Sequence, residues 1–196
     1  MADLSNLPKR QLILQAAADV FATKGYYGAK IEDIAQQAEI GKGTVYEYFK
    51  SKKELFNELI REGFRCLETM VVEEISQAQT VRKKLEGILC MKLIFSTRYQ
   101  KLARIVMLEN IPFDDAFRVW MQEVHHNHLR HIEELVREGI DKQEIAKIDP
   151  GLFAKVYIGG TAFIGNPLIC NNISEEECAE IAEKTIGLYF EGIGMI

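Results

Sequence analysis

The sequence predicts an all-α protein of about nine helices, with a small N-terminal helix-turn-helix domain followed by a larger helical domain. Apolar residues recur at helical spacing through almost the whole chain, and no segment shows the alternation typical of a half-buried strand. The four prolines fall between the periodic segments, where they mark boundaries. Hydrophobic residues make up 47% and charged residues 27% of the chain, as in an ordinary globular protein.

The N-terminal helices are predicted from apolar stripes and end signals. They are expected at residues 8–24, 31–38, 42–49 and 51–74. Gly25 closes the first helix, because glycine readily adopts the backbone conformation that ends a helix. Ser51 and Glu54 form a capping box at the start of the fourth, in which each side chain satisfies a free amide of the other.

The rest of the chain is predicted to form five longer helices. They are expected at residues 81–97, 100–110, 114–139, 149–165 and 174–192. Asp114 and Asp149 are the predicted N-caps of two of them, and proline follows Asp149 at the first helical position. Ser174 and Glu177 form a second capping box.

Residues 31–53 have the spacing of a helix-turn-helix, because two short helices are separated by a turn of three or four residues that contains Gly41. On the second helix Val45 and Phe49 face inward. The outer faces then carry basic, hydroxylated and aromatic side chains: Lys42, Thr44, Tyr46 and Tyr48. Such a set suits a DNA groove and its phosphates, although tyrosines that cover the core of a plain three-helix unit have the same spacing.

Charge is distributed unevenly along the chain, whose net charge is −5. Residues 1–53 carry eight Lys and Arg against six Asp and Glu, whereas the remainder carries 16 against 23. The N-terminal segment is therefore the candidate for contacts with phosphates. Lys52 begins the fourth helix beside free backbone amides, and together they are predicted to form a phosphate clamp.

A specific motif runs through the N-terminal segment: Gly25-Tyr26, Ile34-Ala35, Ala38, then Gly43-Thr44-Val45-Tyr46-x-Tyr48-Phe49-x-x-Lys52-x-x-Leu55-Phe56. Residues 9–60 thereby resemble the DNA-binding domain of the TetR family of bacterial regulators. The resemblance implies a DNA-binding domain at 1–53 and an effector-binding and dimerisation domain at 54–196. It also implies a cytoplasmic, ligand-responsive repressor that binds a palindromic operator as a homodimer and is released by a hydrophobic small molecule.

By matching position, the resemblance implies a set of DNA-binding residues: Lys30, Lys42, Gly43, Thr44, Tyr46, Tyr48 and Lys52. We expect Tyr48 and Lys52 to supply affinity for any sequence, and Thr44 and Tyr46 to supply selectivity. The chain departs from the family pattern at three positions. Lys30 replaces the usual Ser or Thr, Glu39 a frequent Gly, and Gly41 a Ser.

The last two helices are predicted to pair two chains. Residues 152–164 are apolar on more than one face, and such a helix must be covered on both sides. A fully buried core of a monomer would also explain the pattern, whereas the resemblance implies a dimeric four-helix bundle. The predicted dimerisation residues are Phe153, Val156, Gly160, Phe163, Ile164, Ile186 and Tyr189.

The middle helices are rich in large, soft side chains that suit either an ordinary core or an apolar ligand cavity. The predicted effector-binding residues are Phe95, Tyr99, Met107, Phe117, Trp120, Met121, His125 and Tyr157. Each of them alone is better explained by core packing. The family resemblance favours the cavity for the group.

Other functions find little support. The sequence has no Gly-rich phosphate loop and no nucleophile or zinc motif, so no enzyme and no cofactor is expected. The histidines between His125 and His131 include half of a di-iron pattern, but the other half is missing, so no metal is expected. The alternatives are a metal-dependent helical bundle and a partner-binding dimer with a vestigial DNA-binding domain. No membrane span and no signal peptide is predicted, and the four cysteines suit reduced thiols.

Overall fold

The computed structural model describes residues 8–166 and 173–192. Over these residues the chain forms nine helices and no strand, which confirms the predicted all-α class. Pro167 and Cys170, a predicted boundary and one of the four cysteines, lie outside the described residues. None of the helices described is long and apolar enough to cross a membrane.

The chain divides into two compact units. The first unit comprises the residues up to Arg65 together with Lys101–Phe117, and the second comprises Cys66–Gln100 together with the residues from Arg118 onward. The first unit extends past residue 53, because Leu55, Phe56 and Leu59 are buried in the same core as the first three helices. The boundary predicted at residue 53 separates the two expected functions, DNA binding and effector binding with dimerisation, and it stays a prediction.

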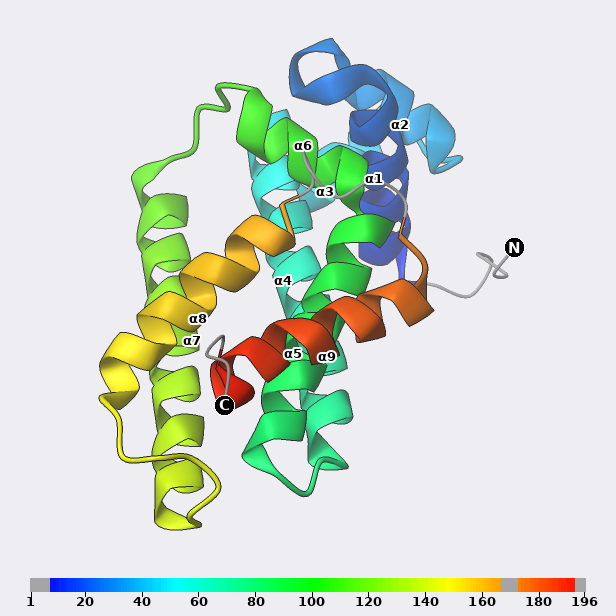
Figure 1. Cartoon of the computed structure of the whole chain (residues 1–196). Helices are drawn as coiled ribbons and strands as arrows, with labels where there is room; N and C mark the ends of the chain where they lie inside the picture. Colours follow the sequence, from blue (N-terminus) through cyan, green and yellow to red (C-terminus); the bar gives the residue numbers. More distant parts are fainter. Residues whose placement is uncertain (1–7, 167–172, 193–196) are drawn as a thin grey trace. The chain divides into compact units, whose positions relative to one another are not determined.

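The first unit is built on a helix-turn-helix. Its elements are α1 (Lys9–Gly28), α2 (Ile31–Gln37), α3 (Lys42–Tyr48), the start of α4 (Lys52–Ser76), and α6 (Gln100–Leu108), which are labelled in Figure 1. Phe21, Phe49 and Phe56 are fully buried at its centre, and the ring of Phe21 meets that of Phe56 edge to face with centroids 4.9 Å apart. Burial of such large rings fixes how the short helices pack.

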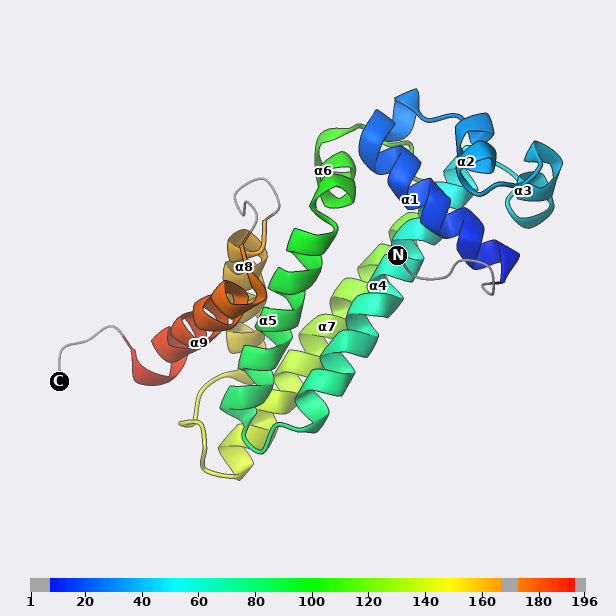
Figure 2. The ribbon, with the colours of Figure 1, turned by 90° about the vertical axis from the view of Figure 1, so that its right-hand side faces the viewer.

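The second unit is arranged around α5 (Val81–Arg98). Figure 2 shows α5 between α7 (Asp115–Asp141) on one side and α8 (Pro150–Ile164) with α9 (Glu175–Glu191) on the other. The α5 and α7 helices run antiparallel, since Lys84 meets Glu138 at 2.9 Å and Lys92 meets His128 at 2.8 Å. The hydroxyl of buried Tyr157 donates to the carbonyl of Leu85 at 2.9 Å and ties α8 to α5.

The helix ends confirm most of the predicted caps. Asp149 accepts from the amides of residues 151 and 152, and the Ser174–Glu177 capping box is complete. Asp114 accepts from the amide of Phe117 at 2.8 Å and so caps α7. The Ser51–Glu54 box is only half formed, because the Glu54 carboxylate accepts from the amide of Lys50 rather than from that of Ser51.

The turn between α2 and α3 explains the family glycine that Glu39 replaces. Glu39 has a φ of 54°, the left-handed conformation that favours glycine. Its amide donates to the carbonyl of Gln36, and the amide of Ile40 donates to that of Ala35. These bonds form a Schellman motif, in which the residue after the helix must be left-handed. Glu39 therefore holds a strained backbone conformation in this turn, because its Cβ makes the left-handed region unfavourable.

Replacing Glu39 by glycine is expected to stabilise the first unit by about 1 kcal/mol, because glycine adopts the left-handed conformation without the clash of a Cβ. Glu39→Ala is the matched control, since it removes the carboxylate and keeps the Cβ. Urea unfolding measures both. Equal stability of the Gly and Ala variants would show that the turn is not strained.

Candidate DNA-binding surface and effector region

The outer face of α3 is the candidate DNA-contacting surface. Val45 is buried below it, whereas Tyr46 and Tyr48 are 45% and 42% exposed. Lys42 and Gly43 are exposed as well, and a Cβ built on Gly43 would meet no atom within 4 Å. Another macromolecule can therefore approach the backbone closely at the start of α3.

Lys42 is held by a partner that the sequence analysis did not single out. Its Nζ lies 2.5 Å from Glu32 Oε1 on α2 and 5.8 Å from the centre of the Tyr46 ring. The hydrogen bond between them holds the pKa of Glu32 below and that of Lys42 above its ordinary value. Because both side chains are exposed, the pair is weak, and a phosphate can take the place of Glu32.

Lys30 is the N-cap of α2, and its side chain cannot accept the hydrogen bond that a Ser or Thr would accept. Only the reciprocal half of the capping box is present, in which the Lys30 amide donates to Asp33 Oδ2 at 3.1 Å. The Asp33 carboxylate also binds Lys24 at 2.9 Å. The Lys30 ammonium is exposed beside the start of α2, where it is available to a phosphate.

Lys52 has a structural role in this fold. Its ammonium donates to the carbonyls of Tyr26 at 2.8 Å, Ala29 at 2.9 Å and Tyr27 at 3.4 Å, and it lies 4.8 Å from the centre of the Tyr26 ring. An ammonium has three protons, so these carbonyls occupy its donors. The predicted phosphate clamp would require one of these bonds to be given up. Lys52 instead ties α4 to the last turn of α1, which follows the break at Gly25, and to Ala29.

The same turn is held from its other side by Glu109, the residue after α6. The helix breaks at Gly25, where φ is 71°. The Glu109 carboxylate accepts from the amide of Tyr26 at 3.0 Å, and a Cβ on Gly25 would lie 2.6 Å from Glu109 Oε1. Glycine is thus required at position 25 for its conformation and for the close approach of the carboxylate.

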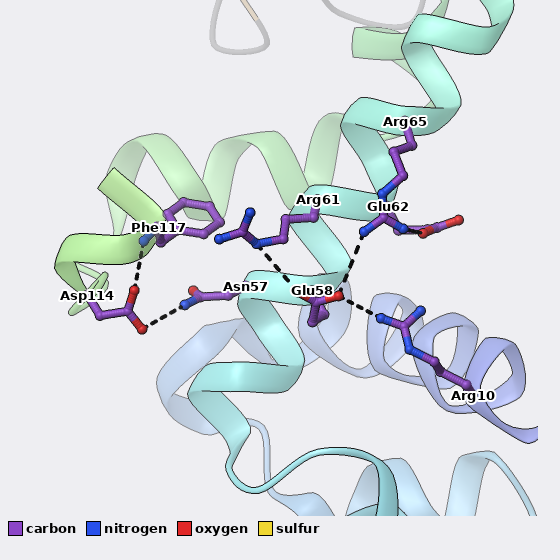
Figure 3. Close-up of polar contacts among 8 residues, drawn as sticks. All are labelled: Arg10, Asn57, Glu58, Arg61, Glu62, Arg65, Asp114 and Phe117. Carbon is purple, nitrogen blue, oxygen red and sulfur yellow. Dashed lines mark hydrogen bonds and ion pairs between the residues drawn. The ribbon is translucent and has the colours of Figure 1, made fainter. Parts of the chain in front are cut away.

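A polar network extends along α4 in the first unit (Figure 3). Glu58 lies at its centre and is contacted by Arg10 at 2.6 Å, Arg61 at 3.4 Å and Arg65 at 3.7 Å. The side-chain amide of buried Asn57, the residue before Glu58, donates to Asp114 at 3.4 Å. The network fixes the start of α1 and the cap of α7 to α4.

The residues predicted to line an effector cavity fall in several places. Phe117 is buried in the first unit, where it stacks on Phe113 with centroids 4.5 Å apart. Met107 belongs to the same unit and is 50% exposed. In the second unit Tyr157 is fully buried in the core, and His125 is exposed. The structure does not bring these four together.

The other predicted effector residues lie at one end of the α5–α7 pair. They are Phe95, Tyr99, Trp120 and Met121, and all are half-buried. The antiparallel register of the two helices places Tyr99 level with Trp120 and Met121 and Phe95 one turn further along, and the rings of Phe95 and Tyr99 lie 4.6 Å apart. Half-buried, soft side chains on facing helices suit an apolar ligand.

Lys92, next to this group, is a residue that sequence reasoning missed. It lies deep in the second unit, and burial lowers its pKa to about 8. The sequence signal was a lone lysine at helical spacing from Ile88, Phe95 and Tyr99 on an otherwise apolar stripe. Its contact with His128 was not predictable, because it depends on the register of α5 against α7.

The His125–His131 cluster does not form a metal site within the described residues, where no group of three metal-ligating side chains comes together. His125, His126 and His131 are exposed. His128 faces the Lys92 ammonium, which would repel a cation.

An exposed apolar stripe follows the outer face of α8. Its members are Leu152, Val156 and Phe163, which are 60%, 52% and 67% exposed, with Gly159 between them. Of the other predicted dimerisation residues, buried Ile186 and half-buried Phe153 and Tyr189 pack inside the second unit. A Cβ on Gly160 would lie 2.8 Å from the Tyr189 hydroxyl, so this glycine serves α8–α9 packing within one chain. Ile164 is half-buried.

Comparison with known proteins supports the DNA-binding interpretation. Residues 13–59 match the model of the tetR family of bacterial regulatory proteins. The chain is 28% identical over 154 residues to a fatty acid metabolism regulator protein of Bacillus subtilis, which covers 79% of either chain.

Two solved structures share the fold. One is the transcriptional regulator FadR from Bacillus subtilis in complex with stearoyl-CoA, with a TM-score of 0.72 and 24% identity over 94% of this chain and 99% of that one. The other is AibR in complex with isovaleryl coenzyme A and operator DNA, with a TM-score of 0.70 and 19% identity over 93% and 98%.

Lys52→Met is expected to destabilise the first unit by about 2 kcal/mol, because three carbonyls lose a charged donor and only part of them regains water. The adjacent Lys53→Met is the matched control and should change stability by less than about 0.5 kcal/mol. Chemical unfolding measures both. Unchanged stability of Lys52→Met, with weaker DNA binding alone, would instead support the phosphate clamp.

Proposed function

Because the chain belongs to the TetR family of transcriptional regulators, we propose that it is a repressor that binds a palindromic operator as a homodimer and is released by an acyl thioester. The observation that carries the proposal is the exposed face of α3, with Lys42, Tyr46 and Tyr48 above the helix-turn-helix core. Such a helix fits the major groove, and two of them on a dimer fit two half-sites. The family consists of regulators, not enzymes. The protein would act in the cytoplasm, where its DNA lies.

The DNA-binding residues divide by geometry. Lys30 and Lys42 are exposed cations at the starts of α2 and α3, suited to phosphates. Tyr46 and Tyr48 present rings and hydroxyls, and half-buried Thr44 presents a hydroxyl at the base of the face. Lys52 contributes by positioning α4 rather than by free donors.

The class of effector rests on the relatives and on the α5–α7 pair. Two structures of the same fold are named as complexes with acyl-CoA thioesters. The half-buried group of Phe95, Tyr99, Trp120 and Met121 offers an apolar surface for an acyl chain. We infer that the acyl chain lies along this end of the pair and that its binding weakens DNA binding by about 1–3 kcal/mol.

Selection of duplexes from a random pool is expected to yield an inverted repeat with half-sites about one helical turn apart. Lys42→Ala should weaken binding to cognate and scrambled duplexes alike, with a smaller salt dependence. Lys184→Ala, which changes a lysine of α9, is the control. Stearoyl-CoA should release the duplex. Failure to enrich any sequence would refute the operator, and retention of the duplex with the thioester bound would refute the effector.

The apolar stripe of α8 is expected to form the dimer interface, because exposed apolar patches of this kind mark interaction sites. Val156→Glu should reduce the mass in solution from twice 22.4 kDa to 22.4 kDa by light scattering and should weaken operator binding. Val119→Glu, at a 53% exposed position on α7, is the matched control and should stay dimeric. A Val156→Glu variant that keeps the doubled mass would place the interface elsewhere.

A further inference from the structure

The second unit contains a deep cationic pair without an acidic partner. Lys92 Nζ lies 2.8 Å from His128 Nε2 and 3.5 Å from His128 Nδ1. Burial lowers the pKa of Lys92 to about 8, and no carboxylate of the described residues forms an ion pair with it. Within the described residues the ammonium therefore has one neutral acceptor for three donors.

Four other lysines of this unit show what Lys92 lacks. Lys83, Lys84, Lys142 and Lys184 each pair with a glutamate at 2.5–2.9 Å, although water also reaches them. Lys92 is the deepest and would gain most from a carboxylate, because an unpaired charge is costly in a medium of low dielectric constant. A buried cation without a counter-ion indicates a site that an anion completes.

The pair lies next to the half-buried apolar group of the effector region and is not fully sealed from solvent. Lys92 and His128 are surrounded by protein, and yet both side chains keep accessible surface. Phe95 lies one turn along α5 from Lys92, and Tyr99 two turns, on the same face. Met121 lies two turns along α7 from His128. The cation thus stands at one end of the half-buried apolar group.

We propose that Lys92, oriented by His128, binds the anionic oxygens of the effector while its apolar part lies along Phe95, Tyr99 and Met121. This rests on the proposed function, in that the ligand is an acyl compound. The anion is a carboxylate or a phosphate, which the same ammonium recognises by charge-assisted hydrogen bonds.

His128 is suited to orient Lys92 because it stays neutral. Burial, with the nearby charges of Lys92, His131 and His125, lowers its pKa to about 3, so its ring nitrogen accepts from the ammonium. The charge of the pair then comes from Lys92 alone. Since the pKa of Lys92 is lowered from its ordinary value of 10.5, its cost to stability is full below about pH 8 and falls as the pH rises toward 10.5.

Lys92→Met, Lys92→Arg and the control Lys184→Met test the proposal in the full-length protein. The probes are stearoyl-CoA, octadecanoate and methyl octadecanoate, measured by calorimetry at pH 7. Lys92→Met should lower the affinity for an anionic probe at least about tenfold and leave the affinity for the methyl ester unchanged. Lys92→Arg should keep part of the affinity for the anionic probe. A loss of affinity for octadecanoate would show that Lys92 binds a carboxylate. A loss of affinity confined to stearoyl-CoA would show that it binds a phosphate.

Ligand-free protein gives a second readout. Lys92→Met should raise the melting temperature by about 2–4 °C at pH 7, with a smaller gain at pH 9.5, because it removes an uncompensated charge. Inorganic phosphate at constant ionic strength should raise the melting temperature of the wild type and not that of Lys92→Met.

The outcomes separate the two proposals. Acyl probes that bind wild type and Lys92→Met equally would overturn the role of Lys92 and leave the effector class intact. If no acyl probe binds the wild type, the effector class is wrong. The anion site then depends on the melting curves, and a Lys92→Met variant that melts lower and responds equally to phosphate would overturn it.

Discussion

The bonds from the Lys52 ammonium to the last turn of α1 and to Ala29 are the interaction on which the first unit depends. The carbonyls of Tyr26, Tyr27 and Ala29 point out of a helix end that breaks at Gly25, and they need donors. Lys52 supplies these donors from α4, and Glu109 accepts the Tyr26 amide from the other side. The direction of α2 follows from this turn, and with it the orientation of the α3 face.

The second unit differs in that it buries polar groups between its packed helices. Tyr157 gives its hydroxyl proton to a backbone carbonyl, and Glu86 shares its buried carboxylate between Arg82 and Lys83. These groups are satisfied within the chain and serve stability. Lys92 has no carboxylate partner among the described residues. This contrast distinguishes a polar group with a structural role from one that we propose to bind a ligand.

Much of the fold could be predicted because helix ends are local. The caps Asp114, Asp149 and Ser174 accept hydrogen bonds from backbone amides two or three residues further along the chain, so spacing alone identifies them. The exposed α3 face followed from periodicity in the same way. The partners of Lys52 and Lys92 come from helices far along the chain, and no local pattern shows them. Phe117 and Tyr157 were assigned to a cavity because a large apolar side chain has the same pattern in a core.

The Glu32–Lys42 pair bears on how salt would act on the proposed contact between Lys42 and DNA. A lysine that meets DNA directly exchanges one condensed cation for itself at each phosphate. In the proposed contact Lys42 would leave the Glu32 carboxylate to reach the phosphate, and that carboxylate would then attract a cation from solution. The protein would thereby take up part of the ions released at the DNA. Glu32 would thus act as an internal counter-ion of Lys42. The ionic strength of the cell would then perturb this contact less than the number of contacted phosphates would suggest.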